Sequence, residues 1–211
     1  MIKRAVRDCS DCELMVQGRC LFAPKKVPAD AVLTAQDMIA QEVSFVRKGV
    51  VAMTVLTSEG DQAHVAVRGP RSLLGLEALR ALPSPGEVTA VTEVQLCAAP
   101  ADRVKAWLGP ETAARRMFEL AMGELLDQRR DVDFRSGTAD ARVARFLLMC
   151  AEHVGRGKES PFSKARAASV LGLRPETLSR VLKRLSDRGI VDSSEGVRVL
   201  DLEALQAVAE A

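Results

Sequence analysis

The chain has 211 residues, enough for two modest domains, and its 47% hydrophobic content is typical of a globular protein and argues against a disordered chain. The formal net charge is +2, so the molecule as a whole is not a polycation. Aromatic residues make up only 3% of the chain, which argues against a stacking surface for single-stranded nucleic acid.

The N-terminal residues 1–24 carry a cysteine motif. Residues 1–7 lack the apolar region of a signal peptide, and no later run approaches a membrane span, so we expect a cytoplasmic protein with no membrane partner and reduced cysteines. Cys9, Cys12 and Cys20 have the spacing C-x2-C-x7-C. A short polar segment has little reason to collect buried residues, so we do not interpret these three as core cysteines.

Residues 27–100 are predicted to form a small barrel or roll of short strands, within a domain spanning 25–110. Strands are expected around residues 43–45, 50–56 and 63–67, with turns at 48–49, 57–61 and 68–70. Residues 87–97 alternate as one further strand, which places Cys97 with Glu93 and Gln95, away from the more apolar face.

Residues 111–135 are predicted to form a long helix, whose apolar residues recur in steps of four and three, as in a coiled-coil seam. A seam between two copies of the chain is preferred to a plain intrachain helix, because a single DNA-reading helix (below) would give little affinity. The predicted dimer-interface residues are Ala114, Phe118, Ala121, Leu125, Gln128 and Val132.

The C-terminal domain, residues 136–211, follows a hinge predicted at 134–138. Thr138 is expected to cap the next helix, whose apolar face includes Cys150 as a small core residue. Two short strands around residues 193–196 indicate a hairpin, and Asp201 is expected to cap a last helix.

Residues 163–185 predict a helix-turn-helix. Ser163 is suited to cap the first helix, Gly172 lies in the turn, and Pro175 fits the first turn of the second helix. In the second helix, Leu178, Val181, Leu182 and Leu185 recur on one face. An amphipathic helix pair in an ordinary bundle is the alternative; the basic opposite face and the hairpin that follows favour DNA binding.

Basic residues are concentrated around this helix pair. Between Lys158 and Arg188 there are eight basic residues against three acidic ones, a charge pattern typical of a module that contacts double-stranded DNA, although a solvated surface would also carry it. The predicted DNA-binding residues are Lys164, Arg166, Arg174, Glu176, Thr177, Ser179, Arg180, Lys183 and Arg184.

Nothing in the sequence indicates an enzyme. His64 and His153 are the only histidines, and no serine, cysteine or carboxylate pairs with either of them in a catalytic sequence pattern. A phosphate-binding loop and the spacing of a metal hydrolase are also missing from the sequence.

The order of these parts resembles the CRP/FNR family of bacterial transcription factors over nearly the whole chain. The most specific piece is Glu176-Thr-Leu-Ser-Arg180, which is similar to the E-x-x-S-R recognition signature of the oxygen-sensing FNR branch. The resemblance implies an α+β fold with an N-terminal β-roll, a dimerisation helix and a C-terminal winged helix-turn-helix. It also implies a homodimer on an inverted repeat closer to TTGAT than to TGTGA.

The resemblance further implies a [4Fe–4S] cluster. Cys97, in Val-Gln-Leu-Cys-Ala-Ala-Pro, resembles the fourth cluster ligand of the FNR branch, and Cys9, Cys12 and Cys20 resemble the other three. The seven-residue spacing before Cys20 is longer than in the best-known members, and the N-terminal arm is shorter. Zinc at the same four thiolates and a thiol–disulfide switch between Cys9 and Cys12 remain alternatives.

Two other stretches of the sequence bear on known properties of the family. A cyclic-nucleotide-responsive regulator is disfavoured, because Glu87 stands near the place where that branch has an arginine for the phosphate. Residues 58–61 resemble a loop that touches RNA polymerase in the family, although a plain hairpin turn explains the same residues equally well.

Overall fold

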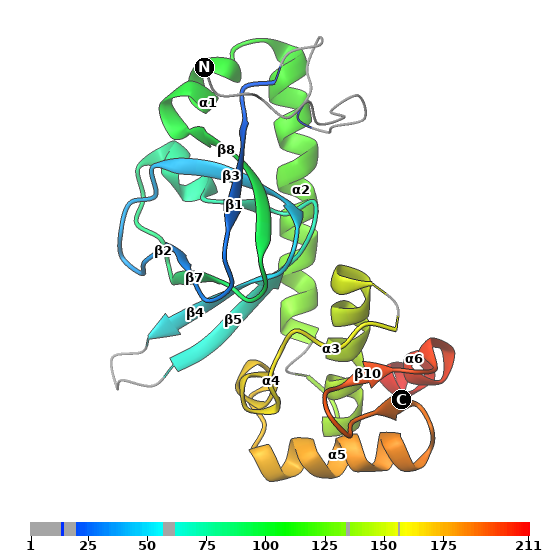
Figure 1. Ribbon diagram of the computed structural model, residues 1–211. Coiled ribbons are helices and arrows are strands. Elements are labelled where there is room, and N and C mark those ends of the chain that lie inside the picture. The colour runs from blue at the N-terminus through cyan, green and yellow to red at the C-terminus, as the bar shows by residue number, and fades with distance from the viewer. Residues whose placement is uncertain (1–13, 15–19, 57–61, 134–135, 156) are drawn as a thin grey trace.

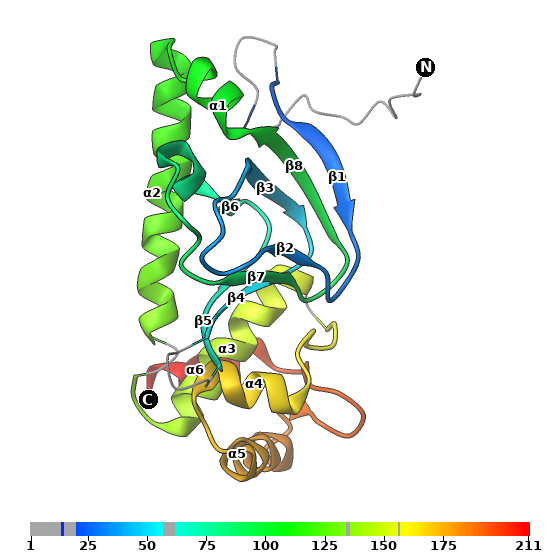
Figure 2. The ribbon, with the colours of Figure 1, turned by 90° about the vertical axis from the view of Figure 1, so that its left-hand side faces the viewer.

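The computed structural model describes residues 14, 20–56, 62–133, 136–155 and 157–211, and the side chains of these residues other than 62–65 and 127–133 (Figure 1). A β-roll and a helical C-terminal domain are joined by one long helix that runs along the side of the roll (Figures 1 and 2). The predicted α+β architecture is confirmed. Within the described residues, no helix combines the length and apolarity needed to cross a membrane.

The roll consists of two four-stranded antiparallel sheets. One has the order β1-β8-β3-β6 and the other β2-β7-β4-β5. Its interior is apolar, with Val46, Val94 and Leu96 almost fully buried between the sheets. The strands are β1 Ala23–Val27, β2 Val32–Thr34, β3 Glu42–Lys48, β4 Val51–Leu56, β5 Gln62–Arg68, β6 Leu73–Leu74, β7 Glu87–Ala90 and β8 Val94–Pro100, and a 3-10 helix, η1, spans Leu76–Arg80.

The single strand predicted at residues 87–97 is wrong, because the chain changes sheets within it. β7 pairs with β2 and β4, whereas β8 pairs with β1 and β3. Between them, Val91 N donates to Val50 O at 2.8 Å and Val50 N donates to Thr92 Oγ1 at 3.0 Å. These bonds hold the crossing segment against the start of β4.

Cys97 points away from the interior of the roll, as predicted, but its own face of β8 is not polar. Val94 and Leu96 face the interior of the roll, but the opposite face of β8 is covered as well. Ala99 on that face is fully buried, and Cys97 is half-buried against a second hydrophobic cluster. Cys97 therefore points away from the interior of the roll and borders a second apolar layer.

Helices α1 Ala101–Trp107 and α2 Glu111–Asp133 follow the roll, and α2 confirms the predicted long helix. The face of α2 that carries Ala113, Met117 and Leu120 is buried. Met117 and Leu120 join the hydrophobic cluster beside Cys97, so α2 is seated on the same end of the roll as that cysteine.

The C-terminal domain is a winged helix-turn-helix. Its buried core includes Phe146, Leu171, Leu185 and Leu205. The predicted caps are confirmed: Thr138 accepts from Ala141 N, Ser163 from Arg166 N, and Asp201 from the amides of residues 203 and 204. The elements are α3 Ala139–Val154, α4 Lys164–Leu171, α5 Pro175–Asp187, β9 Val191–Asp192, β10 Arg198–Val199 and α6 Leu202–Glu210.

The two domains share one continuous core. Val50, Ala52 and Val67 of the roll belong to the same hydrophobic cluster as the centre of the C-terminal domain. Helix α4 lies against β5, as Figure 2 shows. At the edge of this contact, Arg166 Nη1 lies 3.7 Å from Asp30 Oδ1 of the roll.

Candidate nucleic-acid interface and cysteine site

The turn before α5 sets the direction of the predicted recognition helix. Gly172 adopts the left-handed conformation, with φ 58° and ψ 38°, and ends α4. Arg174 is extended at the N-cap of α5, and Pro175 takes the first helical position, where its missing N–H has no partner to lose. The predicted roles of Gly172 and Pro175 in this turn are thus confirmed.

Helix α5 is strongly two-sided. Leu178, Val181, Leu182 and Leu185 are at most 3% exposed and hold the helix to the domain core. The side chains on the opposite face of α5 point to solvent. Among the predicted DNA-binding residues of this helix, only Thr177 is half-buried. The exposed residues are Glu176, Ser179, Arg180, Lys183 and Arg184, with Arg174 just before the helix.

Arg180 and Glu176 lie one helical turn apart on this exposed face. A guanidinium can donate two hydrogen bonds to guanine O6 and N7, and a carboxylate can accept from the amino group of cytosine. The face can therefore present complementary donors and acceptors to the edges of neighbouring bases.

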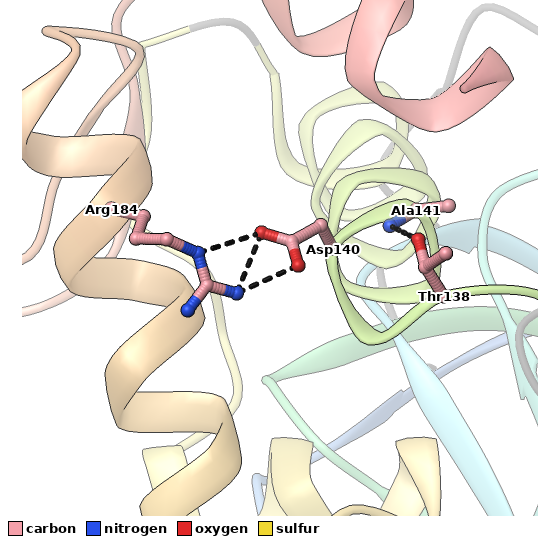
Figure 3. Close-up of polar contacts among 4 residues, drawn as sticks. All are labelled: Thr138, Asp140, Ala141 and Arg184. Atoms are coloured by element: carbon pink, nitrogen blue, oxygen red, sulfur yellow. Dashed lines mark hydrogen bonds and ion pairs between the residues drawn. The ribbon is translucent and has the colours of Figure 1, made fainter.

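Three of the other predicted DNA-binding residues have partners within the chain. Arg184 forms a bidentate ion pair with Asp140 of α3 (Figure 3). Lys164 Nζ donates to Ser193 O of the wing at 3.1 Å. The Arg166 guanidinium lies near Asp30 of the roll and 6.0 Å from the ring centre of Phe162 in its own domain.

The wing is a short hairpin between β9 and β10. Asp192 Oδ1 accepts hydrogen bonds from Ser194 N at 3.0 Å and Ser194 Oγ at 2.7 Å. These bonds lower the pKa of the Asp192 carboxyl from its ordinary value, and the bond from the Ser194 backbone N–H has the larger effect. The wing therefore keeps a fixed turn beside Lys164.

The outer face of α2 carries large apolar side chains. Phe118 is 65% exposed and Leu125 49% exposed, while Ala114 is exposed and Ala121 half-buried. Met122 and Leu126, which the seam pattern did not include, extend the same exposed surface. The side chains of Gln128 and Val132 lie outside those that the structure describes.

The cysteines predicted to act as ligands are only partly described. Cys9 and Cys12 lie outside the described residues. Cys20 is exposed, and its thiol donates to Phe22 O at 3.7 Å. Cys97 lies in β8, paired with Pro24 of β1 and Phe45 of β3. Within the described part of the chain, no three potential ligands gather closely enough to hold a metal ion.

Leu14 is described and lies in the folded core. It stands between Cys12 and Cys20 in the sequence and is fully buried. It belongs to the hydrophobic cluster that also contains Phe22, Met117 and Leu120, and Cys97 packs against this cluster. Leu14 therefore lies in the apolar layer that Cys97 borders.

Comparisons with known proteins identify both domains. Residues 24–109 match a family model described as a cyclic nucleotide-binding domain, and residues 141–208 match a Crp-like helix-turn-helix domain. The chain belongs to the CRP/FNR family of transcription regulators. The regulator therefore binds DNA through its helix-turn-helix, and its family is one of transcription regulators, not enzymes.

Two curated relatives are similar along most of the regulator. The transcriptional activator protein FnrA of Stutzerimonas stutzeri is 28% identical over 176 residues, covering 79% of this chain and 72% of the relative. The transcriptional activator protein anr of Pseudomonas aeruginosa is 27% identical over 175 residues, covering 79% and 71%.

Solved structures show the same fold. FixK2 from Bradyrhizobium japonicum superimposes with a TM-score of 0.77 at 23% identity, covering 90% of this chain and 98% of that one. A CRP-family regulator from Thermus thermophilus gives a TM-score of 0.75 at 21% identity, covering 89% and 97%.

Proposed function

We propose that the regulator responds to oxygen or redox state through a [4Fe–4S] cluster held by Cys9, Cys12, Cys20 and Cys97, and that it binds a TTGAT-like inverted repeat as a homodimer in the cytoplasm. The observation that carries the proposed oxygen sensing is the burial of Leu14 in the hydrophobic side-chain cluster that Cys97 borders. Leu14, which stands between Cys12 and Cys20 in the sequence, thus lies in the apolar layer on the side of β8 where Cys97 lies.

The donor set fits such a cluster in number and type. Four thiolates are the usual ligands of a [4Fe–4S] group, and the C-x-x-C pair can supply two of them from one local loop. Of the proposed ligands that the structure describes, Cys97 is half-buried and Cys20 is exposed. When bound, the cluster supplies a redox-active centre that oxygen can destroy.

The fold offers a route from this site to the dimer face. Leu14 packs in the same hydrophobic cluster as Met117 and Leu120, which lie on the buried side of α2. The opposite side of the same helix exposes Phe118 and Leu125. We infer that a properly folded cysteine segment favours the seating of α2 that pairs two copies, so that loss of the segment's fold shifts the population away from the dimer.

Pairing of two copies also suits DNA reading. One small helix contacts few base pairs, whereas a dimer places two copies of α5 in successive major grooves and reads an inverted repeat. The exposed apolar side chains of α2 support this pairing, because monomeric proteins rarely expose a large continuous apolar surface to solvent. A second copy of the chain is the occupant that we propose for this face.

Action on transcription extends the proposal further. Both curated relatives are named transcriptional activators, and we propose activation for this regulator too. The contact with RNA polymerase is proposed for residues 58–61, which lie outside the described residues. Charge reversal at Glu59 and Asp61 is expected to abolish activation while sparing DNA binding; unchanged transcription would remove the contact from the proposal.

Metal analysis of the full-length protein, purified without oxygen, tests the proposed cluster. Iron and acid-labile sulfide are expected in near-equal amounts, with a brown colour that air bleaches, and Cys97→Ala is expected to lose most of both. Zinc without sulfide would replace the cluster by a zinc site at the same thiolates. Metal-free protein with a Cys9–Cys12 disulfide after air exposure would instead support the thiol switch.

A further inference from the structure

One bidentate ion pair joins two helices of the DNA-binding domain that are distant in the sequence (Figure 3). Arg184 Nε donates to Asp140 Oδ1 at 3.2 Å, and Nη2 donates to Oδ1 at 2.8 Å and to Oδ2 at 2.7 Å. Such a planar fork fixes the relative orientation of the two side chains in a way that a single contact does not.

The pair also fits the two helix ends that carry it. Asp140 lies in the first turn of α3, and Arg184 lies in the last turn of α5. A helix N-terminus favours a negative charge and a C-terminus a positive one. Each charge is thus stabilised by the terminus of its own helix as well as by its partner.

Asp140 stands directly after the hinge from the long helix. Residues 136–138, the described part of the predicted hinge, have contacts within the domain: Arg145 Nη1 donates to Ser136 O at 3.0 Å, and Gly137 takes φ 83°, a conformation that favours glycine. Thr138 Oγ1 then accepts from Ala141 N at 3.2 Å and starts α3 (Figure 3). The Asp140–Arg184 pair therefore connects the start of α3 to the recognition helix α5.

We infer that Asp140 is a positioning residue for DNA reading, which acts by holding Arg184 and so fixes the direction of α5 relative to the start of α3. The inference rests on the proposed role of α5 in base reading. It assigns Arg184 a different role from the phosphate or base contact expected from the sequence. In that contact role, Asp140 would compete with DNA for the guanidinium; in the positioning role, Asp140 supports binding.

The solvent exposure of the pair separates this role from a purely structural one. The Arg184 and Asp140 side chains are 54% and 38% exposed. Exposed ion pairs contribute little to folding stability, because water and salt screen them. Loss of the pair should therefore leave the unfolding temperature nearly unchanged and appear in DNA recognition.

The test compares full-length variants on two probes: the duplex that the wild-type protein enriches from a random-sequence pool, and a duplex of random sequence. Asp140→Asn is expected to weaken binding to the enriched duplex by about threefold or more while leaving binding to random DNA unchanged. Asp140→Glu should recover most of the loss, because it restores a carboxylate. Glu152→Gln, an equal charge change at an exposed position of the same helix, should behave as wild type.

Salt dependence gives the second readout. The positioning role predicts that Arg184→Gln keeps the wild-type slope of log affinity against log salt, since no phosphate contact is lost. A slope smaller by about one, or tighter binding by Asp140→Asn, would overturn the inference and make Arg184 a DNA contact. Failure of base reading itself would appear separately, as equal losses of Arg180→Ala on the two probes.

Discussion

The guanidinium of Arg68 at the end of β5 forms an ion pair with the carboxylate of Glu124 on α2, and the two side chains are only 8% and 11% exposed. Arg68 Nη1 also donates to Val67 O at 2.9 Å. The partners are 56 positions apart in the sequence. This pair ties one sheet of the roll to the helix whose outer face carries the proposed dimer seam.

Removing one member of this buried pair should be costly. Arg68→Ala removes the guanidinium from beside a Glu124 carboxylate that stays buried, so the free energy of unfolding should fall by about 3–5 kcal/mol. Urea unfolding measures the loss. Arg115→Ala removes an exposed ion pair with Glu119, so about 0–1 kcal/mol is expected for this control. Equal losses in the two variants would show that the burial of the Arg68 pair has no energetic consequence.

Substitution of Phe118 tests the proposed dimer. Phe118→Glu places a charge at the centre of the exposed apolar face of α2, so sedimentation should shift from dimer to monomer and affinity for an inverted repeat should fall. Met38→Glu is a matched control, because Met38 is 61% exposed on the roll. A Phe118→Glu protein that sediments like the wild type would place the dimer interface elsewhere.

Arg180 is expected to read bases. Arg180→Ala should cost about 1–3 kcal/mol on the inverted repeat while leaving affinity for random DNA nearly intact, because a bidentate contact to guanine is made only at the correct base. Fluorescence anisotropy at fixed salt measures both affinities. If the substitution weakens binding to both duplexes equally, Arg180 contacts the DNA backbone instead.

Cys150 should differ sharply in reactivity from Cys20. Burial raises the pKa of the Cys150 thiol from its usual 9.0 to about 12, with a smaller opposing effect from the hydrogen bond of Ser160, so the folded protein holds the unreactive thiol at neutral pH. In metal-free protein, iodoacetamide should label Cys20 quickly and Cys150 only after unfolding. Rapid labelling of Cys150 in the folded protein would contradict its burial.

The same pKa shift has a consequence for stability. The unfolded chain loses the Cys150 proton near its usual pKa of 9.0, whereas the folded chain keeps it until about pH 12. The contribution of this group to stability is therefore complete below about pH 9 and is lost as pH rises from there toward 12. The pH dependence of urea unfolding, compared between the wild type and Cys150→Ala, checks this direction.

Local features of the C-terminal domain could be predicted because they depend on near neighbours. A capping hydroxyl such as that of Ser163 or Thr138 bonds to an amide three residues later, and Gly172 meets a backbone requirement within its own turn. The buried face of α5 follows from its helical repeat. These signals are all contained in a few consecutive residues.

Features that depend on tertiary contacts could not be predicted in the same way. β1, Ala23–Val27, contains a proline and two exposed lysines and forms a strand because β8 lies beside it. The second apolar face beside Cys97 is created by Leu14, α1 and α2. The partners of Arg68 and Arg184 are 56 and 44 positions away, and no periodic pattern relates them.

Oxygen sensing is tested most directly by the affinity of oxygen-free, full-length protein for a TTGAT inverted repeat. This affinity is followed together with the iron content of the protein while air is admitted. Affinity should fall by about fivefold or more in step with the loss of iron, with dissociation of the dimer, and Cys97→Ala should start at the low affinity. Tight, air-insensitive binding by protein that holds no iron would contradict oxygen sensing through these four cysteines.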